Sequence, residues 1–148
     1  MVDRQRRDQY AELLRHFAAG LLTNVEYEDQ ADVVLGGTSD IGLCEIWRKA
    51  WFLYDDVRTH RLRGKWVLRP ETRHEVARWI AFLYTDYEYE WPEEPLLGCL
   101  WQFATLGFWG KVHEQRLRGV GDLDVWPFVR DADLDRACRQ PRLLSGAP

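Results

Sequence analysis

Apolar residues recur at helical spacing over much of the chain, and this pattern predicts helices. Between residues 3 and 19 they lie three or four positions apart with Arg and Asp between them, which is the spacing of one helix face. Gly20 provides a stop for this helix. Thr23 and Glu26 then form a capping box, in which the hydroxyl and the carboxylate satisfy free N–H groups at the start of a second helix.

The longest helical pattern runs from Ser39 to Lys65, and we expect the rest of the chain to pack around it. Two apolar series lie on adjacent faces of this segment. One series is Leu43, Ile46, Ala50, Leu53 and Val57, and the other is Cys44, Trp47, Trp51 and Tyr54. Ser39 or Asp40 is the expected N-cap. The basic residues from His60 onward complement the negative end of the helix dipole.

Four further segments are predicted between and after these helices. Residues 30–38 break the helical pattern, and Val33 to Leu35 are expected to be extended. Pro70 opens a helix that we expect to continue to about Tyr89, because the residue before Pro92 is disfavoured in α conformation. Residues 96–109 are apolar on nearly every side, which is typical of a buried or partner-facing helix. Residues 131–139 are expected to form a short last helix.

These elements predict a mainly α fold, a compact single-domain helical bundle of about five helices with at most a short strand pair. The domain is expected to span residues 1–140, with residues 141–148 as a frayed tail. The chain length of 148 residues is typical of one domain. A domain near this size buries roughly 68–70% of its unfolded surface, so it requires no disulfide or metal for stability.

Composition and charge narrow the class of protein. The formal net charge is −4, whereas general nucleic-acid binders carry a basic stripe, so a nucleic-acid partner is not expected. The three cysteines are odd in number and far apart, which favours reduced thiols in the cytoplasm. The chain has no signal-peptide pattern and no run of the roughly 18 apolar residues that a membrane span requires. We therefore expect a cytoplasmic protein that neither spans a membrane nor has a membrane as a partner.

Sequence motifs for cofactors and catalysis are missing from the chain. There is no phosphate-binding loop or dinucleotide fingerprint and no nucleophile elbow. Two His-Glu pairs, at residues 74–75 and 113–114, lack the second His of a zinc protease motif, since Arg78 and Leu117 occupy its position. We therefore expect no cofactor and no metal, and a binding protein is favoured over an enzyme.

One carboxylate and imidazole group supports an alternative, a metal-dependent hydrolase. Asp55, Asp56 and His60 lie close together in sequence, and the four-residue spacing of Asp56 and His60 is compatible with shared ligation. Joined by acids of a facing helix, these side chains would hold Mg²⁺ or Mn²⁺. In the other interpretation Asp55 pairs with Arg58 and His60 caps the helix end.

The stretch from Asp86 to Glu94 is the most distinctive in composition, with five acids, three aromatics and no base. Its aromatics alternate with acids, as in a half-buried strand, but they also continue the preceding helical stripe. Tyr and Trp are enriched in interface hot spots, and a negative patch steers a basic partner. The candidate partner-binding residues are Tyr87, Glu88, Glu90, Trp91, Glu93 and Glu94. The alternative is that the aromatics belong to the core and the acids only solvate the outer face.

The segment from Phe17 to Glu28, FAAGLLTNVEYE, resembles the helix–turn–helix pattern of SHOCT-like short bacterial domains. The shared features are a Gly, an aliphatic residue, a Thr, and then a Glu and an aromatic. The resemblance implies self-association, because this pattern is associated with oligomerisation in SHOCT-like segments. Ordinary helix-turn chemistry also explains the same residues.

The functional hypothesis from the sequence is a small bacterial-type cytoplasmic module that binds another protein. An immunity or antitoxin-like role, with a basic protein as partner, is its most specific form. The alternatives are the metal-dependent hydrolase and a self-associating scaffold that forms a homo-oligomer.

Overall fold

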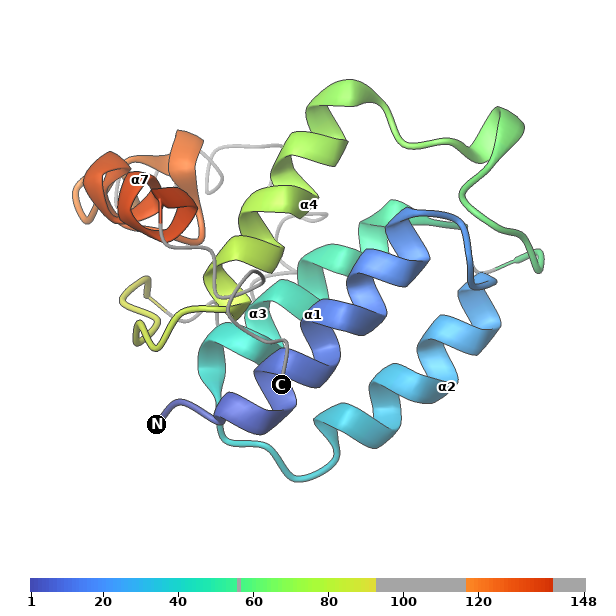
Figure 1. The fold of residues 1–148 in the computed structure, drawn as a ribbon, viewed down its shortest axis with the longest axis horizontal. Helices are drawn as coiled ribbons and strands as arrows, with labels where there is room; N and C mark the ends of the chain where they lie inside the picture. The colour runs from blue at the N-terminus through green and yellow to red at the C-terminus, as the bar shows by residue number, and fades with distance from the viewer. Residues whose placement is uncertain (56, 93–116, 140–148) are drawn as a thin grey trace, which may run out of the picture.

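Five α-helices have their full bounds within the described residues. The computed structural model describes residues 1–55, 57–92 and 117–139. The helices are α1 (Arg4–Ala18), α2 (Asn24–Leu35), α3 (Ile41–Ala50), α4 (Pro70–Leu83) and α7 (Asp131–Arg139) (Figure 1). Short 3-10 turns are η1 (Trp51–Leu53), η2 (Gly64–Trp66) and η3 (Leu123–Val125). In the described ranges, β pairing is limited to an isolated bridge between Thr23 and Arg61. The predicted mainly α fold is confirmed.

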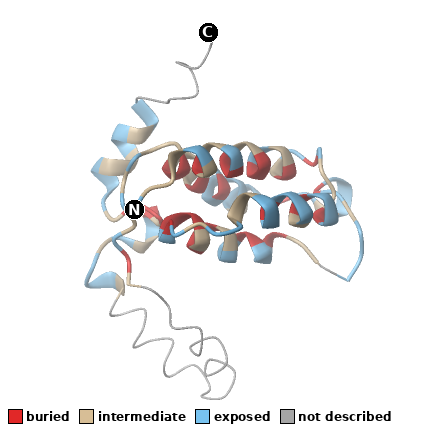
Figure 2. Cartoon of the chain, turned by 90° about the horizontal axis from the view of Figure 1, so that it is seen from below, coloured by how far each residue is buried: buried red, intermediate tan, exposed pale blue. Residues whose placement is uncertain are grey.

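The helices pack around α1 rather than around the predicted central helix. Helix α1 contacts α2 on one side and α4 on the other, and the buried residues of the helices face inward (Figure 2). Phe17 of α1 stacks on Tyr27 of α2 with 4.3 Å between ring centroids. Tyr54 meets both rings edge-on. Aromatic packing therefore joins α1, α2 and the chain that follows α3.

The turn between α1 and α2 forms as the sequence predicts. Gly20 has a φ of +68°, and a Cβ at this position would lie 2.6 Å from Cγ of Arg63, so conformation and packing both require glycine. The capping box is present, because Thr23 and Glu26 each accept a hydrogen bond from the other's backbone N–H. The predicted extended segment at Val33 to Leu35 is wrong, since α2 continues to Leu35.

The predicted helix from Ser39 to Lys65 is wrong beyond Ala50. Helix α3 begins as expected, with Asp40 as its N-cap. The backbone becomes extended at Tyr54, where φ is −145° and ψ is 167°. The apolar pattern also ends near this point, because Val57 is 82% exposed. The basic residues near the end of the predicted helix therefore lie in a loop and do not complement a helix dipole.

The buried side chain of Asn24 explains why the chain leaves the helix. Its amide nitrogen donates to the carbonyls of Asp55 and Arg58, at 3.1 and 3.2 Å. Its oxygen accepts from the N–H of His60 at 2.9 Å. These bonds satisfy backbone groups that a continued helix would have paired within itself. A contact from α2 thus overrides the local helical preference.

Helix α4 also ends earlier than predicted, at Leu83 rather than near Tyr89. Pro70 occupies the first turn as expected. Arg4 of α1 donates to the carbonyls of Leu83 and Thr85, which supplies partners for groups that a helix end leaves free. The chain then continues to residue 92 without regular secondary structure.

Helix α7 confirms the predicted last helix. The predicted apolar helix at residues 96–109 and the predicted tail at residues 141–148 lie outside the described residues. No helix in the described part of the chain has the length and apolar character needed to cross a membrane.

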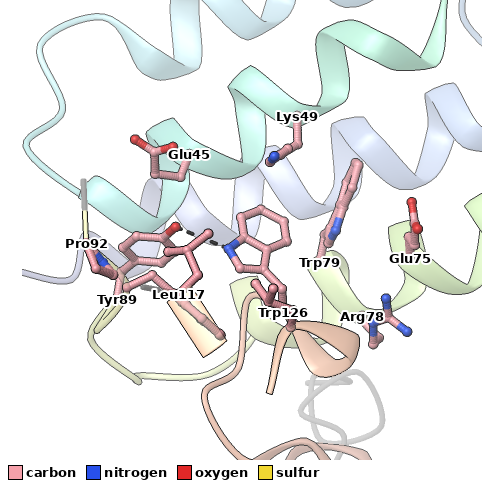
Figure 3. Close-up of a pocket in the computed structure, with 11 residues that line it drawn as sticks. Glu45, Lys49, Glu75, Arg78, Trp79, Tyr89, Pro92, Leu117 and Trp126 are labelled. Atoms are coloured by element: carbon pink, nitrogen blue, oxygen red, sulfur yellow. Dashed lines mark hydrogen bonds between the residues drawn. The ribbon is translucent and has the colours of Figure 1, made fainter. Parts of the chain in front are cut away.

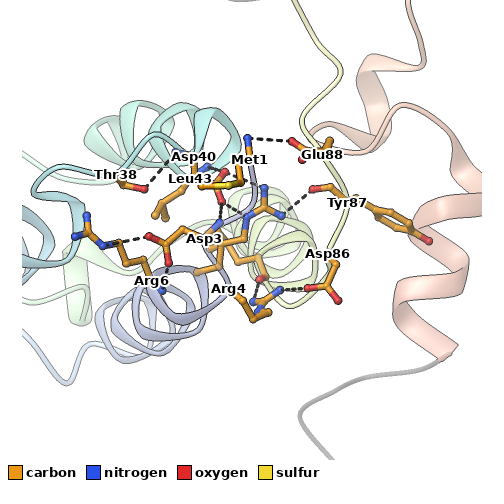
Figure 4. Close-up of polar contacts among 12 residues, drawn as sticks. Met1, Asp3, Arg4, Arg6, Thr38, Asp40, Leu43, Asp86, Tyr87 and Glu88 are labelled. Atoms are coloured by element: carbon orange, nitrogen blue, oxygen red, sulfur yellow. Dashed lines mark hydrogen bonds and ion pairs between the residues drawn. The ribbon is translucent and has the colours of Figure 1, made fainter.

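A buried ion pair connects the starts of α1 and α3 with the end of α4. Arg7 is fully buried, and its Nε and Nη2 donate to the two carboxylate oxygens of Asp40 at 2.6 and 2.9 Å. Nη1 donates to the carbonyls of Thr85 and Tyr87, at 3.2 and 2.8 Å. Asp40 also accepts from the N–H of Asp3 at 2.9 Å. Figure 4 shows these contacts converging on one point.

The pKa of Asp40 is lowered by this arrangement. Burial alone raises the pKa, but hydrogen bonds from Arg7 and from the backbone of Asp3 and Leu43 outweigh that effect. A lowered pKa in the folded protein means that the carboxylate stabilises the fold above the unfolded pKa, about 3.9. This stabilisation is lost as the pH falls through the folded pKa.

Replacing Asp40 by Asn is expected to destabilise the protein strongly. The substitution leaves the buried guanidinium of Arg7 without its counter-charge, which costs about 3–5 kcal/mol. Asp8→Asn is the matched control, because the pair of Asp8 with Arg4 is partly exposed and such a pair contributes about 0–1 kcal/mol. Urea unfolding followed by circular dichroism measures the loss of stability in each variant. Equal small losses in the two variants would contradict the role given to Asp40.

The carboxylate of Asp40 also makes the stability of the protein depend on pH. The wild-type protein is expected to lose stability between pH 5 and the folded pKa of Asp40, while Asp40→Asn lacks this contribution at every pH. The difference in unfolding free energy between the two proteins should therefore shrink as the pH falls. Urea unfolding at a series of pH values measures it, and a difference that stays constant down to acid pH would contradict the assignment.

Candidate functional site

A segment with two different faces follows α4. From residue 86 to residue 91, acids and aromatics alternate, and exposure alternates with them. Asp86, Glu88 and Glu90 are exposed and form what is hereafter named the acidic row. Tyr87 and Tyr89 are half-buried and Trp91 is buried. The strand-like alternation predicts these faces correctly, and the helical continuation does not occur.

The aromatic side chains anchor the segment from beneath. The hydroxyl of Tyr87 accepts from Nη1 of Arg136 on α7 at 3.1 Å, and its ring meets that of Phe128 edge-on. Nε1 of Trp91 donates to the carbonyl of Pro127 at 3.0 Å, in a buried contact. The aromatic residues thus belong to the folded body, and they support the acids that alternate with them.

The acids of the row stay directed toward solvent. Asp86 lies 3.5 Å from the guanidinium of Arg4, and Glu88 lies 3.5 Å from the ammonium group of Met1. Glu90 makes no ion pair with any described residue. These two ion pairs are exposed, and exposed pairs contribute only about 0–1 kcal/mol each.

A pocket of about 250 Å³ lies beside the acidic row. Figure 3 shows aromatic side chains from three parts of the chain along its wall. Nε1 of Trp126 donates to the hydroxyl of Tyr89 at 3.2 Å, and Trp79 of α4 meets Trp126 edge-on at 5.9 Å. Pockets for drug-sized ligands have volumes of roughly 300–1,000 Å³. This one is suited to a single side chain or a comparably small group.

Charges of both signs surround the aromatic wall. Glu45 pairs with Arg48 at 2.5 Å, and Nζ of Lys49 lies 5.8 Å from the ring centroid of Trp126. Nε of Arg78 is buried and has no hydrogen-bond partner among the described residues. The pocket therefore offers an aromatic wall with charges of both signs around it.

The structure brings together four of the six predicted partner-binding residues, namely Tyr87, Glu88, Glu90 and Trp91. Glu93 and Glu94 lie outside the described residues. Sequence reasoning did not include Trp79 and Trp126 in the site, although Trp79 lies on α4 just before the acidic row, because Trp126 joins it from a distant part of the chain. Only their residue type, Trp in an aromatic-rich chain, gave a signal, because their proximity depends on the tertiary fold.

The alternative group of Asp55, Asp56 and His60 is only partly described. Oδ1 of Asp55 accepts from the N–H of Val57 at 2.8 Å, and no ion pair joins Asp55 to Arg58. The ring of His60 stacks on a Trp side chain and lies in a loop, so it does not cap a helix end. Asp56 lies outside the described residues. Among the residues that are described, no three His, Cys, Asp or Glu side chains converge as metal ligands.

Comparison of the chain with models of known protein families, with curated proteins and with solved structures found no match. The resemblance of residues 17–28 to SHOCT-like segments therefore stays a prediction. The structure describes this segment as the end of α1, the turn at Gly20 and the capped start of α2. The functional argument consequently rests on the geometry of the chain itself.

The aromatics anchor the segment and the acids face solvent, so substitutions of the two kinds are expected to change the stability by different amounts. Trp91→Phe removes the donor that pairs with the buried carbonyl of Pro127, and leaving such a group unsatisfied costs about 1–3 kcal/mol. Glu90→Gln changes an exposed side chain with no ion pair, so the change is expected to stay within about 0.5 kcal/mol. Chemical denaturation compares the two variants. Similar stability of both would show that Trp91 does not support the segment.

Proposed function

We propose that this protein is a binding module that docks a basic protein partner on its acidic row. In this proposal the aromatic pocket beside the row receives an anchor side chain of the partner. The observation that supports it most directly is the alternation along residues 86–91, where the aromatics hold the segment and the acids point outward.

The acidic row combines electrostatic steering with a short-range anchor. A patch of one sign raises the rate of encounter with a partner of the other sign. Binding energy is usually concentrated in a few aromatic or Arg contacts near such a patch. Tyr89 belongs both to the segment of the acidic row and to the wall of the pocket. The two features are therefore contiguous, as one interface requires.

The segment is also held in place before any partner binds. Arg7 fixes the carbonyl of Tyr87, and Pro127 fixes the side chain of Trp91. Ordering a loop on binding costs free energy, so a prearranged loop binds more tightly for the same contacts. These anchors support a tight and specific interaction.

An immunity or antitoxin-like role is the most specific form of the proposal. A row of carboxylates is complementary to the basic surface with which a nuclease contacts phosphates. A cytoplasmic location is part of the same proposal. The described cysteines, Cys44 and Cys138, are both free thiols, which is compatible with a reducing compartment.

The proposal is tested by reversing charge on the acidic row. The double variant Glu88→Lys and Glu90→Lys is expected to lose partners that the wild-type chain captures from a lysate of its source cell. Those partners are expected to be basic proteins, and titration calorimetry with a purified partner then measures the loss of affinity. Circular dichroism should show an unchanged fold, because both side chains are exposed.

The matched control is Asp29→Lys with Asp32→Lys on α2. Both residues are exposed, and the two double variants raise the net charge of −4 by the same amount. The control is expected to retain the captured partners. If the acidic-row variant retains them as well, or if the control loses them equally, the acidic row is not the binding site.

A further inference from the structure

A second charged surface lies at the end of the molecule opposite the acidic row. The loops from α1 to α2 and from α3 to α4 lie side by side there, joined by the bridge between Thr23 and Arg61. Figures 1 and 2 both place these loops away from the N-terminus and α7. Helix α4 runs from this end to the acidic row. Residues 20–25, 51–55 and 57–73 are hereafter named the basic end.

The basic end has a local excess of positive charge. Residues 57–73 contain six Arg or Lys and a single acid, Glu71, in a chain whose net charge is −4. Only Arg61 of these six makes an ion pair with a described residue, and its partner is Glu26 at 3.7 Å. The other five are exposed and have no such pair, namely Arg58, Arg63, Lys65, Arg69 and Arg73.

Helix physics does not account for these cations. They precede or begin α4, where the helix dipole is positive and disfavours positive charge. The exposed positions of these side chains leave them hydrated and accessible to an anionic partner. The loop is nevertheless well fixed, since Asn24 binds its backbone and His60 stacks on Trp66 at 4.3 Å.

Exposed apolar side chains gather at the same end. Phe52 is 88% exposed and Val57 is 82% exposed. Of the ten large apolar side chains that are exposed in the described residues, six belong to the basic end, namely Leu21, Val25, Trp51, Phe52, Val57 and Val67. A contiguous exposed apolar patch marks an interaction site, whereas apolar side chains exposed singly are ordinary.

We propose that the basic end docks on an anionic lipid surface. The Arg and Lys side chains would contact lipid phosphates and carboxylates, for which guanidinium groups are well matched, while Phe52 and Val57 enter the interfacial layer. A nucleic acid would pair with the cations but would leave the apolar side chains in water. An anionic lipid surface would pair with the cations and would also remove the apolar side chains from water. Docking at this end leaves the acidic row free at the other.

Vesicle flotation with the full chain tests this surface. Binding is expected to vesicles of phosphatidylcholine mixed with phosphatidylserine, to be absent with phosphatidylcholine alone, and to weaken at high salt. Arg58→Glu with Lys65→Glu is expected to weaken binding by more than about tenfold. Arg130→Glu with Arg139→Glu makes the same change of charge at the other end of the molecule and is expected to bind like the wild type.

The apolar contribution is tested by Phe52→Ser. Removing a Phe side chain that enters the lipid interface is expected to weaken vesicle binding by about tenfold or more. Val33→Ser on α2 is the control, since Val33 is 81% exposed and lies outside the basic end. No binding to the anionic vesicles overturns the proposal, and so does unchanged binding of Phe52→Ser. Binding of a DNA duplex without binding of vesicles overturns it in favour of a nucleic acid.

Discussion

The buried pair of Arg7 and Asp40 is the constraint on which the arrangement of this protein depends. A guanidinium removed from water must have its donors satisfied, or the cost of burial exceeds the gain from folding. Arg7 meets this requirement with the carboxylate of Asp40 and the carbonyls of Thr85 and Tyr87. Its position therefore fixes where the chain runs after α4. Gly42 allows α3 to pack closely against this point, since a Cβ there would lie 3.0–3.2 Å from its neighbours.

The two proposed binding surfaces lie at opposite ends of α4, and Arg7 helps to place one of them by binding the carbonyl of Tyr87. The acidic row begins within three residues of the carboxyl end of α4, and the basic end lies at its amino end. Opposite charges on opposite ends do not neutralise each other over that distance at physiological ionic strength. Under the two proposals, a basic protein at one end and an anionic lipid surface at the other would bind independently.

Sequence reasoning succeeded where structure depends on local chemistry. The capping box at Thr23, the N-cap at Asp40 and the proline at the start of α4 were all predictable, because each acts within one helical turn. It failed where a distant residue competes with local preference. Asn24 on α2 binds the backbone where the predicted central helix would continue. Arg4 on α1 binds a carbonyl just after the end of α4. The composition of the acidic row was evident, but the pocket was not, because Trp79 and Trp126 meet only in the tertiary fold.

A double-mutant cycle on the central pair tests this account most directly. Arg7→Met and Asp40→Leu each leave one buried charge unpaired, whereas the double variant removes both charges. We expect the double variant to be more stable than the sum of the two single losses predicts, with a coupling energy of about 2 kcal/mol or more in the unfolding free energy. Losses that add to within about 0.5 kcal/mol would show that the two side chains act independently and would contradict the account.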